Sequence, residues 1–219
     1  MTLAHDQETI TRLRGLEVAS VSDALDALGY RDQVMNPTVR PLSAVPVAGR
    51  AFTWLASSSV VAVGESYDRG IEAVDMLSAG DVVVVATGEC TVSASWGELL
   101  STRAAALGAM GAVTDGAVRD VAGIRNLGFP VFGAAVNARD ARSRLTVVNY
   151  QIAVRCGGVV VAPGDYILGE DDGVVVIPQG AVAEVIDRSE RHLGLEVVVR
   201  EQLGSGRSAR SAFEEHNVL

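Results

Sequence analysis

The chain of 219 residues contains no lysine, and all 18 of its cationic side chains are arginine. A protein without lysine cannot form a Schiff base with a carbonyl substrate, anchor pyridoxal phosphate or use a P-loop lysine. If such a protein cleaves carbon–carbon bonds, another group must take up the electrons of the broken bond, and a metal ion is the obvious substitute.

Cysteine, clustered positive charge and long apolar runs are also scarce. The two cysteines, Cys90 and Cys156, stand in no CxxC motif and near no histidine, which predicts reduced, buried thiols. The net charge of -9, with no basic block, argues against nucleic acid as a ligand. No segment approaches the roughly eighteen apolar residues of a membrane span, and the N-terminus lacks a signal-peptide core. We therefore expect a cytoplasmic protein that binds no membrane.

The composition and the apolar periodicity predict a compact α/β fold. Hydrophobic residues make up 48% of the chain, and glycine is frequent, with 23 residues. We expect one domain over residues 1–204 and a polar tail over 205–219. The predicted helices cover residues 6–15, 20–28, 69–78, 98–107, 121–127 and 180–203. The predicted strands cover residues 47–56, 59–63, 82–86, 111–114, 130–135, 146–154, 159–162, 166–168 and 174–177.

Two of these helices carry more detailed predictions. Ser20 or Ser22 is expected to cap the second helix, and Gly29 follows it as a left-handed residue. The helix over 69–78 is expected to turn an apolar face to the core, formed by Ile71, Val74, Met76 and Leu77.

The segment Trp96-Gly97-Glu98-Leu99-Leu100 leads from an extended stretch into a helix. The free N–H groups of the first helical turn, on Glu98, Leu99 and Leu100, favour a small anion such as a carboxylate. Gly97 would let that anion approach the backbone closely. In an alternative interpretation, Glu98 only stabilises the helix dipole.

A second polar segment, Asp115 to Asp120, follows the strand over 111–114 and so lies at the carboxyl end of a sheet, where α/β proteins bind ligands. Arg119 can bind a carboxylate or a developing enolate. Asp120 can hold a hard cation by one oxygen and leave water in the other positions. Alternatively, Asp120 caps the following helix and Arg119 is solvated.

Together the two segments resemble the family that holds 4-hydroxy-4-methyl-2-oxoglutarate aldolase and the ribonuclease E activity regulator A. The enzymes of that family share an acidic residue, twenty intervening residues and then Arg-Asp; here Glu98 precedes Arg119-Asp120 with the same spacing. The resemblance covers nearly the whole chain. It includes further segments at 21–25, 80–84, 128–132, 163–165 and 171–178.

The resemblance implies a role for each residue of the motif. The backbone of Gly97 to Leu100 would bind the carboxylate of a 2-oxo acid, Arg119 would stabilise the enolate, and Asp120 would ligate Mg²⁺ or Mn²⁺. Glu98 stands where some aldolases have aspartate and would act through bound water. A glutamate from a neighbouring subunit completes the family's site. Glu196 is the candidate here, although it could be an ordinary exposed helix residue.

The resemblance further implies a swivelling-type β/β/α sandwich that assembles as a homotrimer or hexamer with sites between subunits. The implied activity is metal-dependent cleavage of a 4-hydroxy-2-oxo acid to pyruvate, with oxaloacetate decarboxylation as a side reaction. An alternative is a non-catalytic regulator that binds an RNA-degrading enzyme. In the regulator the aspartate after the arginine is replaced, whereas this chain retains Asp120, which favours the enzyme.

Overall fold

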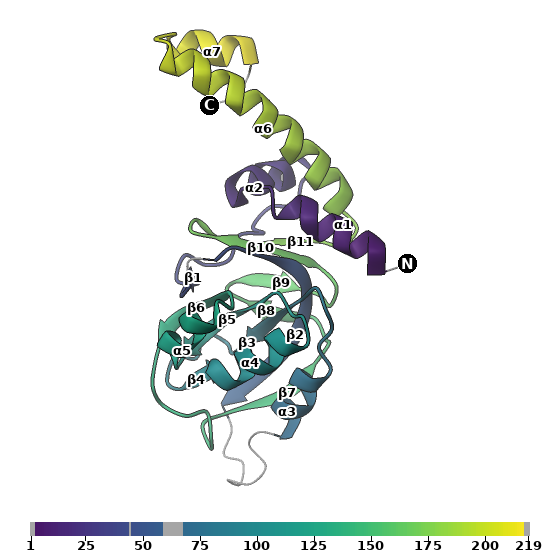
Figure 1. Ribbon diagram of the computed structural model, residues 1–219, viewed down its shortest axis with the longest axis vertical. Helices are drawn as coiled ribbons and strands as arrows, with labels where there is room; N and C mark the ends of the chain where they lie inside the picture. Colours follow the sequence, from purple (N-terminus) through teal and green to yellow (C-terminus); the bar gives the residue numbers. More distant parts are fainter. Residues whose placement is uncertain (1–2, 44, 59–67, 217–219) are drawn as a thin grey trace.

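Figure 1 shows the computed structural model of the chain, which describes residues 3–43, 45–58 and 68–216. The strand predicted over 59–63 lies outside these residues. The helices are α1 (Leu3–Leu13), α2 (Val18–Ala27), α3 (Asp68–Asp75), α4 (Glu98–Ala106), α5 (Val121–Leu127), α6 (Val182–Gly204) and α7 (Ala209–His216). No helix among the described residues is both long enough and apolar enough to cross a membrane.

Within the described residues, nine strands form one mixed sheet, and β8 and β9 form a small second one. The strands are β1 (Arg40–Pro41), β2 (Val47–Ser58), β3 (Asp81–Ala86), β4 (Ala94–Trp96), β5 (Gly111–Val118), β6 (Val131–Val136), β7 (Leu145–Tyr150), β8 (Val154–Cys156), β9 (Val159–Val161), β10 (Tyr166–Glu170) and β11 (Gly173–Ile177). The main path runs β1-β6-β5-β3-β2-β10-β11, with β4 paired to β5 and β7 paired to β2.

The sheet curls until its two edges approach each other. Arg40 of β1 donates from Nη1 to the carbonyls of Asp171 and Asp172, in the turn between β10 and β11, at 3.4 Å each. These strands are the first and last of the main path. The resulting closed layer leaves little open edge for pairing with other chains.

Strand β3 shows how the core divides into layers. Its side chains alternate between the two faces of the sheet, as in any strand. Val83 and Val85 face the cluster beneath α3, α4 and α5, whereas Val82 and Val84 face an inner cluster with Phe132 and the β8–β9 hairpin. Because both faces are covered, β3 is a continuous run of valines rather than an alternation of apolar and polar residues.

A third cluster packs α1, α2 and α6 against β10 and β11, with Leu13, Leu25, Ile177 and Val185 among its fully buried members. Helices therefore cover both outer sides of two β-layers, and the predicted single-domain α/β sandwich is confirmed.

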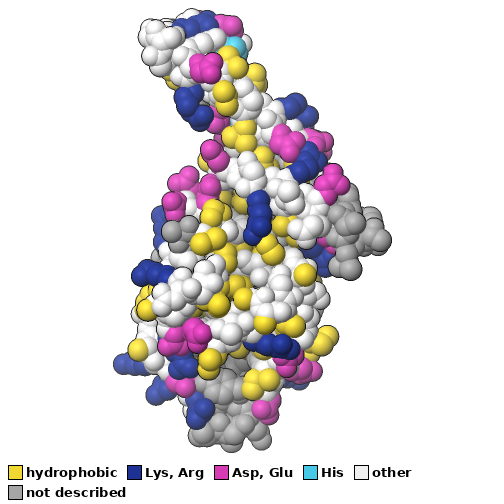
Figure 2. Space-filling view, in the orientation of Figure 1, with side chains coloured by type: hydrophobic (Ala, Val, Ile, Leu, Met, Phe, Trp, Pro, Cys, Tyr) yellow, Lys and Arg dark blue, Asp and Glu magenta, His cyan; other side chains and the backbone are white. Residues whose placement is uncertain are grey.

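Helix α6 carries the chain away from this body, and α7 lies against its far end (Figure 1). The segment predicted as a polar tail after Gly204 thus contains a helix. Ala212 of α7 is fully buried and packs with Val199 and Leu203 of α6. Figure 2 shows hydrophobic side chains along the projecting arm. The large apolar side chains that α6 exposes there are Leu195, Val197 and Val198.

Several local predictions need correction. Helix α2 begins at Val18, so neither Ser20 nor Ser22 caps it; instead Glu170 accepts the Val18 N–H at 2.6 Å. Strand β5 continues past residue 114 to Val118. The strand predicted over 146–154 divides near Gln151, whose φ of 53° breaks the extended backbone.

The prediction of an apolar face on the helix over 69–78 is only half confirmed, because two of its four residues point outward. Val74 and Leu77 are buried, whereas Ile71 and Met76 are 55% and 59% exposed. Of the two thiols predicted to be buried, Cys156 is buried and Cys90 is half-buried, and neither forms a disulfide.

Candidate active site

Three parallel strands end at one edge of the sheet, and each is followed by a polar segment. Strand β4 pairs in parallel with β5, and β5 with β6, so their carboxyl ends lie side by side. The Arg119 N–H donates to the carbonyl of Trp96 at 3.0 Å, and the Asn137 N–H donates to that of Val118 at 3.0 Å. The residues that follow β4, β5 and β6 therefore converge, as expected for a ligand site in an α/β sheet.

After β4, Gly97 occupies the N-cap position of α4 with an extended backbone and no capping side chain. The first helical bond is the one from the Ser101 N–H to the carbonyl of Gly97, at 3.1 Å. The N–H groups of the first turn consequently have no partner within the helix. Such an uncapped helix start attracts anions.

The uncapped start is held by a buried hydrogen-bond chain. Trp96 donates from Nε1 to Oγ of Ser101 at 2.8 Å, and that hydroxyl donates to the Gly97 carbonyl at 3.0 Å. Trp96 also packs against Trp54, with ring centroids 5.5 Å apart. Both tryptophans are buried in the core, and their packing holds the helix start in place.

After β5, Asp120 stands at the N-cap position of α5 in the left-handed conformation, with φ of 58°. A residue other than glycine is strained there, and such outliers gather at functional sites. Its carboxylate makes no capping hydrogen bond. The alternative in which Asp120 merely caps the helix is therefore not what the structure shows.

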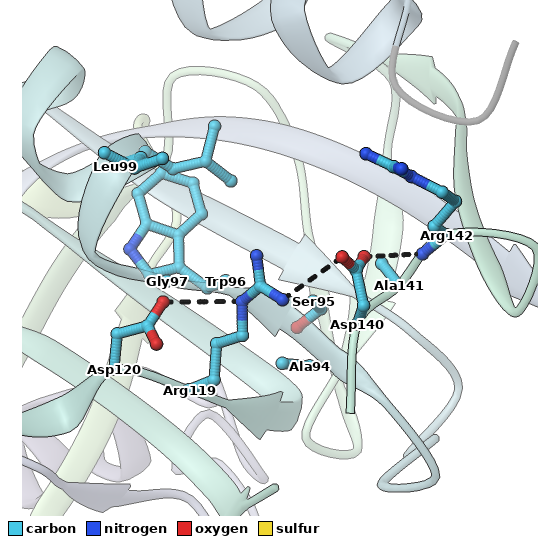
Figure 3. A pocket seen from close by; sticks show the side chains of 11 residues that line it. Ala94, Ser95, Trp96, Gly97, Leu99, Arg119, Asp120, Asp140, Ala141 and Arg142 are labelled. Atoms are coloured by element: carbon cyan, nitrogen blue, oxygen red, sulfur yellow. Dashed lines mark hydrogen bonds and ion pairs between the residues drawn. The ribbon is translucent and has the colours of Figure 1, made fainter. Parts of the chain in front are cut away.

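Arg119 is not simply solvated either. Its Nε lies 3.4 Å from Oδ2 of Asp120, and its Nη1 lies 3.3 Å from Oδ2 of Asp140. Figure 3 shows the guanidinium between the two carboxylates, with its third nitrogen directed away from both. A Cβ added to Gly97 would lie 3.1 Å from Oδ2 of Asp120 and 3.3 Å from Cγ of Arg119. The absence of a side chain at Gly97 is what lets these groups meet the helix start.

These groups line one cavity of about 290 Å³. That volume lies near the lower end of small-ligand pockets, which span roughly 300–1,000 Å³. Its lining residues are Ala94, Ser95, Trp96, Gly97, Leu99, Leu100, Arg119, Asp120, Asp140, Ala141 and Arg142. The cavity thus brings together Gly97, Leu99, Leu100, Arg119 and Asp120 from the predicted site.

Two predicted residues do not line this cavity. Glu98 lies against α5, where a Cβ on Gly123 would be 2.8 Å from its Cγ, and its Oε1 accepts a hydrogen bond from Thr102 at 2.8 Å. Glu196 is on the projecting helix α6, where its Oε1 lies 3.2 Å from Nε2 of His192 and its Oε2 pairs with Arg200 at 3.6 Å. Helix α6 projects away from α4, β4 and α5, whose ends surround the cavity (Figure 1), and Glu196 is not among the lining residues.

Two charged lining residues were missed from the sequence, Asp140 and Arg142. Both lie in the loop after β6, and Asp140 accepts the Arg142 N–H at Oδ1, 2.8 Å away. A signal for them exists: the strand over 130–135 was predicted, and the segment that follows it is polar. The carboxyl end of that strand could have been searched in the same way as Arg119-Asp120.

The donor set suits a hard divalent cation. No group of three or more metal-binding side chains occurs among the described residues. Mg²⁺, however, needs only one or two carboxylates and keeps several waters. The Asp120 carboxylate is 52% exposed, engages no capping N–H and lines the cavity. It fits the role of a single protein ligand, with room for water and substrate oxygens.

Comparison with known proteins gives consistent results. The model of a family described as RraA-like, Aldolase/RraA, matches residues 18–176. A Halalkalibacterium halodurans protein named "Putative 4-hydroxy-4-methyl-2-oxoglutarate aldolase" is 35% identical over 185 residues, covering 83% of this chain and 82% of that protein. Protein DlpA of Legionella pneumophila is 31% identical over 204 residues; these are 90% of this chain but 32% of DlpA, so the chain spans about a third of DlpA's length.

Among solved structures, that of Streptomyces coelicolor RraAS2 has a TM-score of 0.82 and 27% sequence identity with this chain. The match covers 90% of this chain and 98% of that one. RraAS2 is described as "an unusual member of the RNase ES inhibitor RraA protein family".

Proposed function

Since the chain belongs to the RraA-like, Aldolase/RraA family, we propose that it is a divalent-metal-dependent lyase that cleaves a 4-hydroxy-2-oxo acid to pyruvate. The substrate is of the type of 4-hydroxy-4-methyl-2-oxoglutarate, and oxaloacetate is decarboxylated at the same site. The cofactor is Mg²⁺ or Mn²⁺.

One observation carries this proposal: an uncapped helix start, an arginine and an uncapped aspartate meet around one small cavity. Oδ2 of Asp120 lies 3.1 Å from where a Cβ of Gly97 would be, and 3.4 Å from Nε of Arg119. A 2-oxo acid has a carboxylate beside a keto oxygen. The helix start suits the carboxylate, and the two side chains suit a cation and the developing negative charge.

In this proposal the chain's residues bind and polarise the 2-oxo acid end of the substrate. The N–H groups at the start of α4 hold the carboxylate, and Arg119 adds positive charge where the enolate oxygen forms. A cation held by Asp120 would, when bound, polarise the keto group and stabilise the enolate. The lack of lysine agrees with this arrangement, because no imine can perform the same role.

The proposed cleavage passes through the enolate of pyruvate. A water held by Glu98 takes the proton of the 4-hydroxyl, C4 becomes a carbonyl carbon, and the C3–C4 bond breaks. Its electron pair forms the enolate of pyruvate, and C3 then takes up a proton. With oxaloacetate the same bond breaks, carbon dioxide leaves, and C3 is again protonated. A role through water is the one that suits Glu98, which packs on Gly123 and does not line the cavity.

The decisive assay is pyruvate release from 4-hydroxy-4-methyl-2-oxoglutarate and from oxaloacetate, with Mg²⁺ or Mn²⁺ and with EDTA. We expect turnover of both substrates with either metal and none after chelation. Turnover that is unchanged by EDTA would show that the metal assignment is wrong.

We further propose a homotrimer or hexamer in which Glu196 enters the site of a neighbouring subunit. The support is the projecting helix α6, which carries Glu196 away from its own cavity and exposes Leu195 at 42%, Val197 at 50% and Val198 at 41%. Apolar side chains grouped on a projecting helix are typical of a protein interface. Light scattering coupled to gel filtration gives the oligomeric state.

A non-catalytic regulator that binds an RNA-degrading enzyme is the alternative function. It is favoured by the likeness to RraAS2 and by the net charge of -9, which suits a basic partner. It predicts tight co-purification with that partner and no metal-dependent turnover. The uncapped, cavity-lining Asp120 favours the enzyme.

A further inference from the structure

Strand β5 contains one extra residue shortly before it reaches the cavity. Against the neighbouring strand β6, Thr114 lies opposite Gly133, and Ala117 lies opposite Ala135. Three steps along β5 therefore match two along β6, which is a β-bulge at residues 115–116. Because successive side chains of a strand point to opposite faces, one extra residue reverses the face on which every later side chain lies.

Strand β4 has a bulge of its own beside this one. Ala94 lies opposite Ala117 of β5, and Trp96 lies opposite Val118. Two steps along β4 therefore match one along β5, and Ser95 is the extra residue. Bulges are frequent next to active sites, where they change the direction of a side chain. Here both strands are bulged at the point from which they lead into the cavity.

The hydroxyl of Thr114 joins the two bulges. Its Oγ1 accepts the Gly116 N–H at 3.0 Å, inside the bulge of β5, and donates to the carbonyl of Val85 in β3 at 3.0 Å. The same oxygen lies 2.9 Å from Oγ of Ser95, and that hydroxyl lies 3.2 Å from the carbonyl oxygen of Ala117. Thr114 is almost fully buried and is not among the residues that line the cavity. Any effect of Thr114 on a ligand therefore passes through the backbone that it holds.

We propose that Thr114 is a positioning residue, whose hydroxyl fixes the two bulges and so directs Arg119 and Asp120 toward the start of α4. This inference rests on the proposed function, because that function makes Arg119 and Asp120 the groups that bind the ligand. The alignment is close, since a Cβ on Gly97 would lie 3.3 Å from Cγ of Arg119. Without the hydroxyl, the buried Gly116 N–H loses its acceptor, which favours a different backbone at the bulge.

The same sheet offers a matched control in Thr53. Like Thr114, Thr53 is almost fully buried in a strand and donates to a backbone carbonyl, that of Ile152 at 2.6 Å. It belongs to β2 and does not line the cavity. Replacing either threonine by valine removes one hydroxyl and keeps a β-branched side chain, which strands favour. A general loosening of the sheet would therefore appear in both variants, and a misaligned ligand site only in the Thr114 variant.

The test is equilibrium binding of oxalate by calorimetry in the presence of Mg²⁺. Oxalate is unreactive, and its adjacent carboxylates imitate the carboxylate and the enolate oxygen of the proposed intermediate. We expect Thr114→Val to bind oxalate roughly tenfold more weakly than wild type, as the loss of one or two buried hydrogen bonds allows. Thr114→Ser, which keeps the hydroxyl, and Thr53→Val should each bind as wild type does. The melting temperature should fall in both valine variants, because each leaves a buried carbonyl without its hydroxyl donor.

Wild-type affinity in Thr114→Val would overturn the inference, as would an equal loss in Thr53→Val or a failure of Thr114→Ser to restore binding. Wild type that binds no oxalate would also overturn it, because no anion site would then exist for Thr114 to align. If Thr114→Val does not fold, Thr114→Ala removes the hydroxyl from a smaller side chain and is measured in its place.

Since the assay measures binding, it separates this inference from the proposed activity. Weaker oxalate binding in Thr114→Val alone, in a protein that releases no pyruvate, supports the positioning role and removes the aldolase. Pyruvate release that is equal in wild type and Thr114→Val, with equal oxalate binding, keeps the aldolase and removes the role of Thr114.

Discussion

Nη1 of Arg119 lies 3.3 Å from Oδ2 of Asp140, so an ion pair joins the end of β5 to the loop after β6. Because Asp120 contacts Nε of the same guanidinium at 3.4 Å, the group is held on two sides. An arginine oriented in this way loses little further freedom when it binds an anion. The Asp140 pair therefore prepares Arg119 for its ligand.

The first prediction concerns this pair. Asp140→Ala should lower kcat/KM for pyruvate release roughly tenfold, because a half-exposed charge-assisted pair contributes about 1–2 kcal/mol. Asp140→Asn should recover part of the loss, since the amide oxygen can still accept the Arg142 N–H. Asp172→Ala, in the exposed β10–β11 turn, is the control and should match wild type. An Asp140→Ala enzyme with wild-type kinetics would mean that the pair does not position Arg119.

The second prediction tests Asp120 as the metal ligand. Asp120→Asn removes the charge but suits the left-handed backbone, which asparagine tolerates nearly as well as aspartate. We expect loss of Mn²⁺ binding, followed by electron paramagnetic resonance, and at least a hundredfold lower turnover, or about 3 kcal/mol. Asp32, exposed and also left-handed with φ of 60°, offers a matched Asp32→Asn control that should bind Mn²⁺ normally. Mn²⁺ binding that survives in Asp120→Asn would rule out this ligand.

The sequence predicted the parts of the fold that depend on local patterns. The helix over 121–127 and the strand over 174–177 follow from apolar spacing, and both lie where expected. Ile71 and Met76 were misjudged because periodicity identifies an apolar face but not whether anything covers it. Burial depends on tertiary packing, which no short window of sequence contains.

Only part of the candidate site could be predicted, because the rest depends on which strands lie side by side. Gly97 and Arg119-Asp120 follow segments that the sequence predicts to be extended. The twenty residues between Glu98 and Arg119 identify them as parts of one motif. Asp140 and Arg142 became visible only once β6 was seen to lie beside β5. The left-handed backbone of Asp120 was also hidden, because most residues with that φ are glycine and the sequence gives no local reason for it.

The third prediction concerns space at the helix start. Gly97→Ala requires no change of backbone, since φ of -161° is ordinary extended chain. Its Cβ would lie 3.1 Å from Oδ2 of Asp120 and so push apart the groups that bind the ligand. We expect kcat/KM to fall tenfold or more, as roughly 1 Å of misplacement can cost a hundredfold. The melting temperature should change little. Gly180→Ala, where a Cβ meets nothing within 4 Å, should leave both quantities unchanged.

The fourth prediction concerns alkaline stability. Burial, together with a hydrogen bond to Asp6 at 2.9 Å, raises the pKa of Tyr166 from 10.0 to about 12. The folded state therefore holds this proton more tightly than the unfolded state does. The resulting stabilisation is complete below pH 10 and is lost as the pH rises through about 12. Chemical denaturation across this interval should show a steeper loss of stability in wild type than in Tyr166→Phe. Tyr30→Phe, at an exposed tyrosine, should follow wild type.

The fifth prediction tests whether Glu196 acts across a subunit boundary. Arg119→Ala and Glu196→Ala should each be nearly inactive alone, because each removes one part of every site. Mixed assemblies contain sites in which an intact Arg119 meets an intact Glu196 of the neighbouring subunit. After mild denaturation and joint refolding of equal amounts, roughly a quarter of wild-type activity should return, which is the chance of that pairing in a cyclic oligomer.

Activity can return on mixing only if each site takes Arg119 from one subunit and Glu196 from its neighbour. If Glu196 acted within its own chain, every mixed site would still lack one residue, and no activity would return. If Glu196 were only an exposed helix residue in pairs with His192 and Arg200, the Glu196→Ala variant would be active alone. Glu201→Ala, at an exposed position of the same helix, should be active alone and controls for changes in α6 itself. Recovery near a quarter therefore requires both an oligomer and a Glu196 that enters the neighbouring cavity.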